Sequence, residues 1–243
     1  MEIFNLKNGI LVDINNPEKS TVADIVAITK ELNYVAGYRL GTRLIIRNGL
    51  RDISSLIKKQ TSKPLLYDHQ KFGNEIPEIC SGDILDDIKD SGIDGIVILP
   101  LGGKKVLESI VNKCNKINLL PVVCGDLSYP GYFSSEGGYI ENNTQQKIYI
   151  DAAKLGVSHL IMSCNRIDRI KIYCNELNAI IGQLKIFFTA ISSTECKELP
   201  DACSHIRQNK AYAIFNTEFK SPEEYRQNLS TFWDSFRKKF DIS

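Results

Sequence analysis

Short runs of consecutive apolar residues recur along the whole chain, separated by stretches with apolar residues at helical spacing. An unbroken apolar run of roughly four to eight residues is typical of a strand buried on both faces, whereas spacing of about three to four residues is typical of an amphipathic helix. The runs predict strands at 9–13, 34–41, 64–67, 94–100, 119–125, 158–163, 184–190 and 211–215.

The stretches between these runs predict the helices. The expected helices span 20–32, 44–59, 76–90, 104–116, 144–155, 166–181, 195–208 and 221–240, and the pattern is weakest in 195–208. Alternation of this kind predicts a parallel sheet covered by helices. Eight such units in 243 residues indicate an α/β protein with a (β/α)8 TIM barrel, a single domain over 1–243. A doubly wound open sheet is the alternative, although it does not need eight regular repeats.

Composition and net charge limit the classes of protein to which the chain can belong. The chain is 43% hydrophobic and 24% charged, as in globular proteins, and its net charge of +1 predicts no strong attraction to nucleic acid or to a membrane. The first residues lack the apolar core of a signal peptide, and no apolar run has the length of a membrane span. We therefore expect a cytoplasmic protein with neither nucleic acid nor membrane as a partner.

The cysteines and histidines do not form a metal-binding pattern. There are seven cysteines, an odd number, widely spaced and without a Cys-x-x-Cys pair, which indicates reduced thiols rather than a disulfide framework or a zinc site. The three histidines are scattered. We expect no metal.

The third predicted strand leads into a cluster of ionisable residues. Asp68, His69 and Lys71 follow the apolar run almost directly, and Glu75 precedes the next helix. Parallel barrels present catalytic groups at the carboxyl ends of their strands. A carboxylate near a lysine also keeps that lysine charged. The alternative is a solvated turn with a surface ion pair of little energetic value, and the residues alone leave both interpretations open.

Two further features bear on the kind of site. The segment 126–143 is long, polar and rich in glycine, and a loop of this length in a compact fold is often functional. No Gly-x-Gly-x-x-Gly or P-loop pattern follows the first strand, which argues against a dinucleotide or nucleoside triphosphate site.

Three stretches carry a resemblance to a known family. They are Val-Ala-Gly-Tyr-Arg-Leu-Gly at 35–41 with Asn-Gly-Leu at 48–50, Tyr-Asp-His-Gln-Lys at 67–71 with Ile-Pro at 76–77, and Leu-Ser-Tyr-Pro-Gly-Tyr-Phe-Ser-Ser-Glu-Gly-Gly-Tyr at 127–139. From the first strand to about residue 170 the chain resembles the orotidine 5′-monophosphate decarboxylase family. It is most similar to the branch whose third strand ends in Asp-His-Gln-Lys.

The resemblance implies a homodimeric barrel that binds a small pyrimidine nucleotide near its dimer interface. It implies a cofactor-free decarboxylation that forms uridine monophosphate in pyrimidine biosynthesis. In that family a lysine ammonium stabilises the carbanion left by CO2 and protonates it, and positioned charge is the main physical means.

The implied roles can be assigned residue by residue. Lys71 matches the proton-donating lysine and Asp68 the acid before it, while Glu75 stands where the family has an aspartate that it contributes across the dimer interface. Asp13 matches an acid near the ribose, and Ser128 matches a serine that touches the pyrimidine. These five residues, with Arg39 and Thr217, make up the expected site, and we expect Phe72 and Ile76 near the dimer interface.

Other positions depart from the family pattern. Arg39 stands where the family usually has its first lysine, and arginine is planar and bulkier than lysine. The family's Gln-Gly-Gly phosphate loop is replaced by 189–195, which has no glycine, and its Gly-Arg by Asn216 and Thr217. The hydroxyls of Ser192, Ser193, Thr194 and Thr217 are the remaining candidates for binding an oxyanion weakly, although Glu195 and Glu218 would repel it.

These departures keep two alternatives open. One is a non-catalytic barrel that binds a ligand or a partner. The other is a related lyase or aldolase that acts on a different substrate. In every case we expect Asp13, Arg39, Asp68, Lys71 and Ser128 to converge at one mouth of the barrel.

Overall fold

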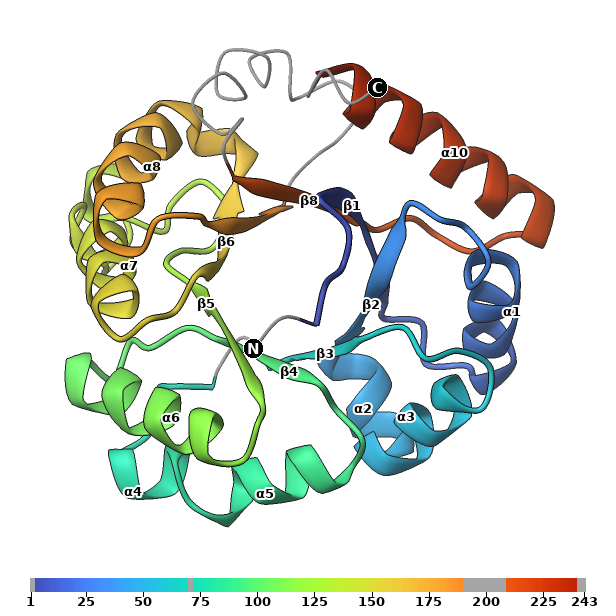
Figure 1. The fold of residues 1–243 in the computed structure, drawn as a ribbon, viewed down its shortest axis with the longest axis horizontal. Helices are drawn as coiled ribbons and strands as arrows, with labels where there is room; N and C mark the ends of the chain where they lie inside the picture. The colour runs from blue at the N-terminus through green and yellow to red at the C-terminus, as the bar shows by residue number, and fades with distance from the viewer. Residues whose placement is uncertain (1–2, 70–71, 190–208, 240–243) are drawn as a thin grey trace.

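Eight parallel strands close into a barrel in the computed structural model, which describes residues 3–69, 72–189 and 209–239 (Figure 1). Each strand pairs with the next along the chain, and β8 pairs with β1. The predicted (β/α)8 barrel is therefore confirmed. The strands are β1 Asn8–Ile14, β2 Val35–Gly41, β3 Leu65–Asp68, β4 Gly95–Ile98, β5 Leu120–Cys124, β6 His159–Ser163, β7 Lys185–Thr189 and β8 Lys210–Phe215.

Helices surround the barrel on its outside (Figure 1). They are α1 Lys19–Thr29, α2 Thr42–Asn48, α3 Leu50–Lys58, α4 Pro77–Cys80, α5 Asp83–Asp90, α6 Lys104–Lys116, α7 Thr144–Lys154, α8 Ile167–Ile181 and α10 Pro222–Lys239, with short 3-10 turns η1 Ser134–Glu136 and η2 Cys164–Arg166. The predicted helix 195–208 lies outside the described residues. In the ranges that the structure describes, no helix is long and apolar enough to cross a membrane.

Two of the predicted helices were wrong as single elements. The stretch 44–59 forms α2 and α3, because Gly49 between them adopts a φ of +82°, a conformation that other residues rarely accept. The stretch 76–90 forms α4 and α5, separated at Gly82, whose backbone is extended. A Cβ at Gly82 would lie 2.9 Å from the Glu78 carbonyl oxygen. Apolar periodicity continues through both breaks, so the pattern alone could not reveal them.

The core has one inner and two outer parts. A cluster that includes Phe4, Leu66, Val122, Phe187 and Tyr212 fills the barrel interior, and two larger clusters lie between the strands and the helices. The strands are buried on both faces, as continuous apolar runs predict. Because apolar side chains fill the barrel interior, polar side chains lie at the carboxyl ends of the strands.

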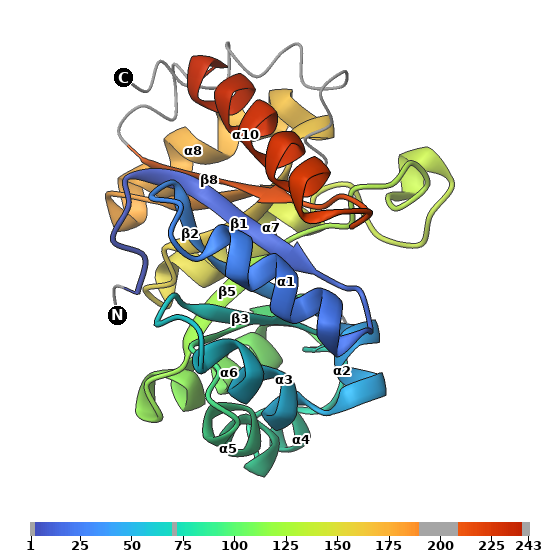
Figure 2. The same cartoon turned by 90° about the vertical axis from the view of Figure 1, so that its right-hand side faces the viewer.

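The loop 126–143 leaves the carboxyl end of β5 and projects from that end of the barrel (Figure 2). Among the described cysteines, all are free thiols and all are buried: Cys80, Cys114, Cys124, Cys164 and Cys174. In the described part of the chain, no group of three or more histidine, cysteine, aspartate or glutamate side chains could hold a metal ion.

Candidate functional site

Three charged side chains meet where β1, β2 and β3 end. Asp13 is paired in register with Arg39 on the neighbouring strand, and Gly41 further along β2 is paired with Asp68. Arg39 lies between the two acids: its Nη1 is 3.3 Å from Asp13 Oδ1, and its Nη2 donates a hydrogen bond to Asp68 Oδ2. The side chains of Asp13, Arg39 and Asp68 are 5%, 13% and 4% exposed, so this charged cluster is buried.

In this cluster, burial and the attraction between opposite charges shift the pKa values of the side chains in opposite directions. Burial raises the pKa of Asp13, Arg39 partly offsets that rise, and repulsion from Asp68 adds to it. For Arg39, burial lowers the pKa, but attraction by Asp13 and Asp68 outweighs burial and raises it above its ordinary value. The guanidinium is therefore a permanent cation that makes the burial of two carboxyl groups tolerable.

Some polar atoms of the cluster keep spare hydrogen-bonding capacity. Arg39 Nε and Asp68 Oδ1 are buried and have no hydrogen-bond partner among the described residues, and the 3.3 Å contact to Asp13 Oδ1 is an ion pair without hydrogen-bond geometry. Most buried polar atoms in proteins do have partners. Among the described residues, a buried donor and a buried acceptor therefore lie without a partner beside the cavity.

A cavity of about 220 Å³ opens above the cluster. Arg39 and Asp68 form part of its wall, Ser128 and Tyr129 border it from the projecting loop, and Val97 and Ile161 supply apolar surface. Three of the predicted site residues therefore line one cavity, at the mouth where barrel enzymes carry their active sites. The arrangement suits a small ligand with polar groups.

A second ion pair at this mouth was not predicted. Asp126 follows β5 directly and Arg166 follows β6, and the Arg166 Nε lies 2.9 Å from Asp126 Oδ2. The Asp126 side chain is only 1% exposed, and this burial raises its pKa to about 6 although Arg166 and Arg169 lower it. Both residues stand just past strand ends, which was the signal available in the sequence.

Cys124 also lines the cavity but is not suited to act as a nucleophile. Burial raises the pKa of its thiol, the nearby Asp126 raises it further, and the thiol donates a hydrogen bond to the Asp126 carbonyl oxygen at 2.9 Å. A thiol nucleophile needs a lowered pKa. The chemistry of the site therefore rests on its carboxylates and cations.

The remaining predicted site residues lie elsewhere or outside the described residues. Lys71 is one of the residues that the structure does not describe. Glu75 is exposed, Thr217 is half-buried just after β8, and neither is among the described residues that line the cavity. Phe72 is 5% exposed and packs in the core of its own barrel, whereas Ile76 is 57% exposed. Of the two residues predicted near a dimer interface, only Ile76 presents free surface.

A larger cavity lies outside the mouth. It measures about 440 Å³ and is bordered by α6, α7 and the projecting loop, with Leu107, Ile140 and Ile148 on its apolar side. Its charges are already paired, because Lys104 lies 3.6 Å from Asp151. We assign the candidate site to the smaller cavity, where unpaired buried polar atoms converge.

Solved structures with the same fold include two orotidine 5′-monophosphate decarboxylases. The enzyme from Methanocaldococcus jannaschii, complexed with the inhibitor BMP, superposes with a TM-score of 0.73 at 19% identity, over 93% of this chain and 98% of that one. The enzyme from Pyrococcus horikoshii OT3 superposes with a TM-score of 0.72 at 19% identity, over 94% and 99%. An uncharacterized conserved protein from Geobacillus kaustophilus gives a TM-score of 0.66 at 14% identity, over 92% and 99%.

No protein-family model and no curated protein sequence matches the chain. The structural likeness therefore establishes the fold over nearly the whole chain. It is the same fold that the sequence resemblance implied. The activity has to be argued from the site.

Proposed function

We propose that this chain is an orotidine 5′-monophosphate decarboxylase-like lyase whose active site is the mouth formed by Asp13, Arg39 and Asp68. The observation that carries the proposal is the buried ion-pair cluster of these residues beside a cavity that Ser128 also borders. Lys71 follows Asp68 by three positions, as in the Asp-His-Gln-Lys branch that the chain resembles, although the spacing of Asp68, Lys71 and Glu75 is wider than the family's commoner Asp-x-Lys-x-x-Asp. The fold shared with the two solved decarboxylases supports the same assignment.

In the proposed reaction the bond between ring carbon 6 and the carboxylate breaks, CO2 leaves, and the electron pair remains on carbon 6. The Lys71 ammonium stabilises that carbanion and transfers its proton to it, and water later returns a proton to the lysine. Asp68 favours the charged form of Lys71. Ser128 contacts the pyrimidine. No cofactor takes part in these steps.

Arg39 has a distinct task in this scheme. Two buried carboxylates facing an anionic nucleotide would repel it, and the guanidinium between them offsets one of the two negative charges. Asp13 then contacts the ribose, while Arg39 lines the wall of the cavity that takes the ligand. The arginine thus takes over the charge balance that the family assigns to a lysine.

The proposal includes a two-fold homodimer, in which Glu75 reaches the partner's site. The exposed side chains of Ile76 and Ile79, 57% and 53% accessible, would be covered by the second copy. Sedimentation equilibrium of the purified chain at micromolar concentration measures this directly. A monomer would remove Glu75 from the proposed machinery.

A second candidate function is a barrel of the same fold that acts on a different substrate or only binds one. It is favoured by the absence of glycine from 189–195 and by Asn216 and Thr217 in place of a Gly-Arg pair. Without a glycine-rich loop or an arginine, phosphate loses its usual partners. Weak binding of the phosphate group with intact chemistry supports the first candidate, and absence of turnover supports the second.

The test is an ultraviolet assay of orotidine monophosphate loss with wild type, Lys71→Ala, Arg39→Lys and the control Lys19→Ala. Lys71→Ala should lower kcat at least about a hundredfold, because it removes the proton donor. Arg39→Lys should hold or raise activity, since lysine is the family's residue. Lys19 is half-exposed and pairs with Asp52 on the surface, so its loss should not matter. Wild type that shows no turnover above the Lys71→Ala background rejects the decarboxylase.

A further inference from the structure

An arginine at the start of the next unit makes several of the contacts that tie the projecting loop 126–143 to the barrel. Arg166, in the turn η2 after β6, is only 11% exposed and contacts two acids of the loop. Its Nε lies 2.9 Å from Asp126 at the loop's beginning, and its guanidinium forms an ion pair with Glu136 in the middle of the loop. One side chain therefore joins two loop positions ten residues apart.

Glu136 in turn organises the loop around itself. Its Oε2 accepts backbone N–H groups from Gly131 at 3.1 Å, Tyr132 at 3.2 Å and Phe133 at 3.4 Å, and it receives Arg166 Nη2 at 3.1 Å. The Arg166 hydrogen bond, together with these backbone N–H groups, lowers the pKa of Glu136 to about 2. A charged carboxylate that collects several donors fixes the backbone that supplies them.

An aromatic ring reinforces this connection. Phe133 is fully buried, and the guanidinium groups of Arg166 and Arg169 lie over it at 4.6 and 4.4 Å from the ring centroid. Arginine over an aromatic face is attractive, and the attraction grows as water is excluded. The loop is also compact, since a Cβ at Gly138 would lie 2.1 Å from the Tyr132 carbonyl oxygen.

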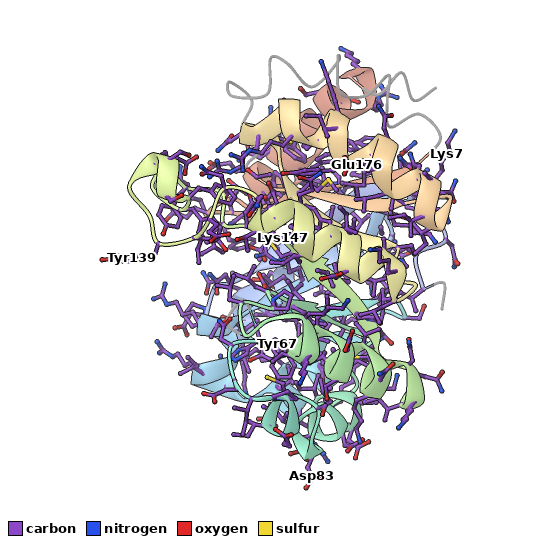
Figure 3. The ribbon with its side chains drawn as sticks, turned by 90° about the vertical axis from the view of Figure 1, so that its left-hand side faces the viewer. Lys7, Tyr67, Asp83, Tyr139, Lys147 and Glu176 are labelled. Carbon is purple, nitrogen blue, oxygen red and sulfur yellow. The ribbon has the colours of Figure 1, made fainter. Side chains whose placement is uncertain are left out.

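The same turn reaches the wall of the candidate active site. Asn165 Nδ2 donates a hydrogen bond to the Ser128 carbonyl oxygen at 3.2 Å, and Arg166 Nη2 contacts the Tyr129 carbonyl oxygen at 3.4 Å. Ser128 and Tyr129 border the cavity above Arg39 and Asp68. The position of the cavity wall thus depends on contacts made from η2. By contrast, Tyr139 at the outer tip points away from the barrel and is fully exposed (Figure 3).

We propose that Arg166 and Glu136 are positioning residues, which hold the loop so that Ser128 is already placed against the cavity before a ligand binds. The inference rests on the proposed function for the identity of the ligand, but the ordering of the loop does not depend on it. Fixing the wall in advance lowers the entropic cost of binding. The pair should therefore act mainly on the affinity for substrate rather than on the chemical step.

The test uses the full chain with Glu136→Gln, which preserves the size and one acceptor oxygen but removes the charge. The matched control is Glu141→Gln in the same loop, which breaks an exposed ion pair with Lys147. Arg166→Lys is the conservative third variant, because lysine keeps the charge but cannot fork between two acids. Arg166→Ala is avoided, since it would leave Asp126 buried without a partner and could unfold the protein.

Two readouts decide the proposal. Backbone amide hydrogen exchange across 127–133 in ligand-free protein should become at least about tenfold faster in Glu136→Gln, while amides of β5 and β6 stay as in wild type. The KM for orotidine monophosphate should rise roughly tenfold and kcat change less than about threefold. Arg166→Lys should fall between wild type and Glu136→Gln, and Glu141→Gln should match wild type in both readouts.

Each contrary result has a defined meaning. Unchanged loop exchange in Glu136→Gln overturns the proposal. Faster loop exchange with unchanged KM and kcat in an active enzyme also overturns it, because the loop would then not position the site. Wild type without turnover rejects the proposed function, and the exchange measurement alone then decides whether Arg166 and Glu136 order the loop.

Discussion

The two ends of the barrel interior are filled with different kinds of side chain. At the amino end, Phe187 stacks on Tyr212 with ring centroids 4.9 Å apart, and Phe4 packs edge-on against Phe187 at 5.3 Å. At the carboxyl end, Arg39 lies between two buried carboxyl groups under a cavity. The amino end is filled by aromatic rings, which are stabilised by dispersion and apolar burial, whereas the carboxyl end is lined by charged side chains below a cavity.

The two ends of the same sheet therefore differ in role: the amino end contributes mainly to stability, and the carboxyl end carries the candidate site. The rings of Phe4, Phe187 and Tyr212 form an aromatic plug, which gains its energy from the area it buries. The charged mouth costs free energy to build, because two carboxyl groups lose their hydration, and some of its polar atoms have no hydrogen-bond partner among the described residues. An energetic cost of this kind is typical of functional sites.

The largest loss of stability should follow from emptying the plug. Phe187→Ala removes a fully buried ring that contacts Phe4 and Tyr212, and should lower the free energy of unfolding by about 4 kcal/mol. Urea denaturation measures it, with the exposed Tyr139→Ala as the control that should stay within about 0.5 kcal/mol of wild type.

Removing the cation at the other end should cost somewhat less and should depend on pH. Arg39→Ala leaves Asp13 and Asp68 buried together and should destabilise the protein by about 3 kcal/mol at pH 8. Burial already raises the pKa of Asp13, and loss of Arg39 raises it further. A raised folded-state pKa contributes stability at low pH that disappears as pH rises through it, so the deficit should shrink on acidification.

The control for this second experiment is Arg47→Ala, which breaks an exposed ion pair with Glu18 and should cost less than about 1 kcal/mol at every pH. A pH-independent deficit for Arg39→Ala would mean that the two acids do not face each other once the guanidinium is gone. The two ends of the barrel would then differ in the shape of their side chains, and not in the electrostatic contribution of those side chains to stability.

The smallest effect should come from trimming the one polar atom of the plug. Tyr212 donates a hydrogen bond from its hydroxyl to the Leu6 carbonyl oxygen at 2.6 Å, and Tyr212→Phe should cost about 1 kcal/mol. Thermal unfolding compared with Tyr139→Phe measures this. A cost as large as that of Phe187→Ala would show that the amino end depends on polar contacts after all.

The barrel could be predicted from the sequence because parallel strands that are buried on both faces appear in it as continuous runs of apolar residues. The strand positions agree with the structure to within one or two residues, whereas the helix breaks at Gly49 and Gly82 were missed. A glycine within a helical pattern can be tolerated or can end the helix, and the choice depends on packing that the sequence does not display. The outer layer was therefore predicted less well than the sheet.

The sequence could predict that residues near the carboxyl ends of neighbouring strands lie close together. Asp13, Arg39 and Asp68 stand at or near the last positions of three adjacent strands, so a closed parallel barrel brings them together. The partnership of Arg166 with Glu136 was missed because it joins residues 30 positions apart through a loop without periodicity. The roles of Asp13, Arg39, Asp68 and Ser128, like those of Lys71, Glu75 and Thr217, remain predictions.

Closure of the sheet between β1 and β8 also has a consequence for synthesis of the chain. The two strands are bonded across 203 positions, and Phe232 and Trp233 of α10 pack against both outer clusters. During translation β1 consequently has an unpaired outer edge until β8 has emerged, and open strand edges invite pairing with other chains. The nascent barrel depends on its last strand and helix to remove that hazard, so truncation near the C-terminus should affect solubility before it affects secondary structure.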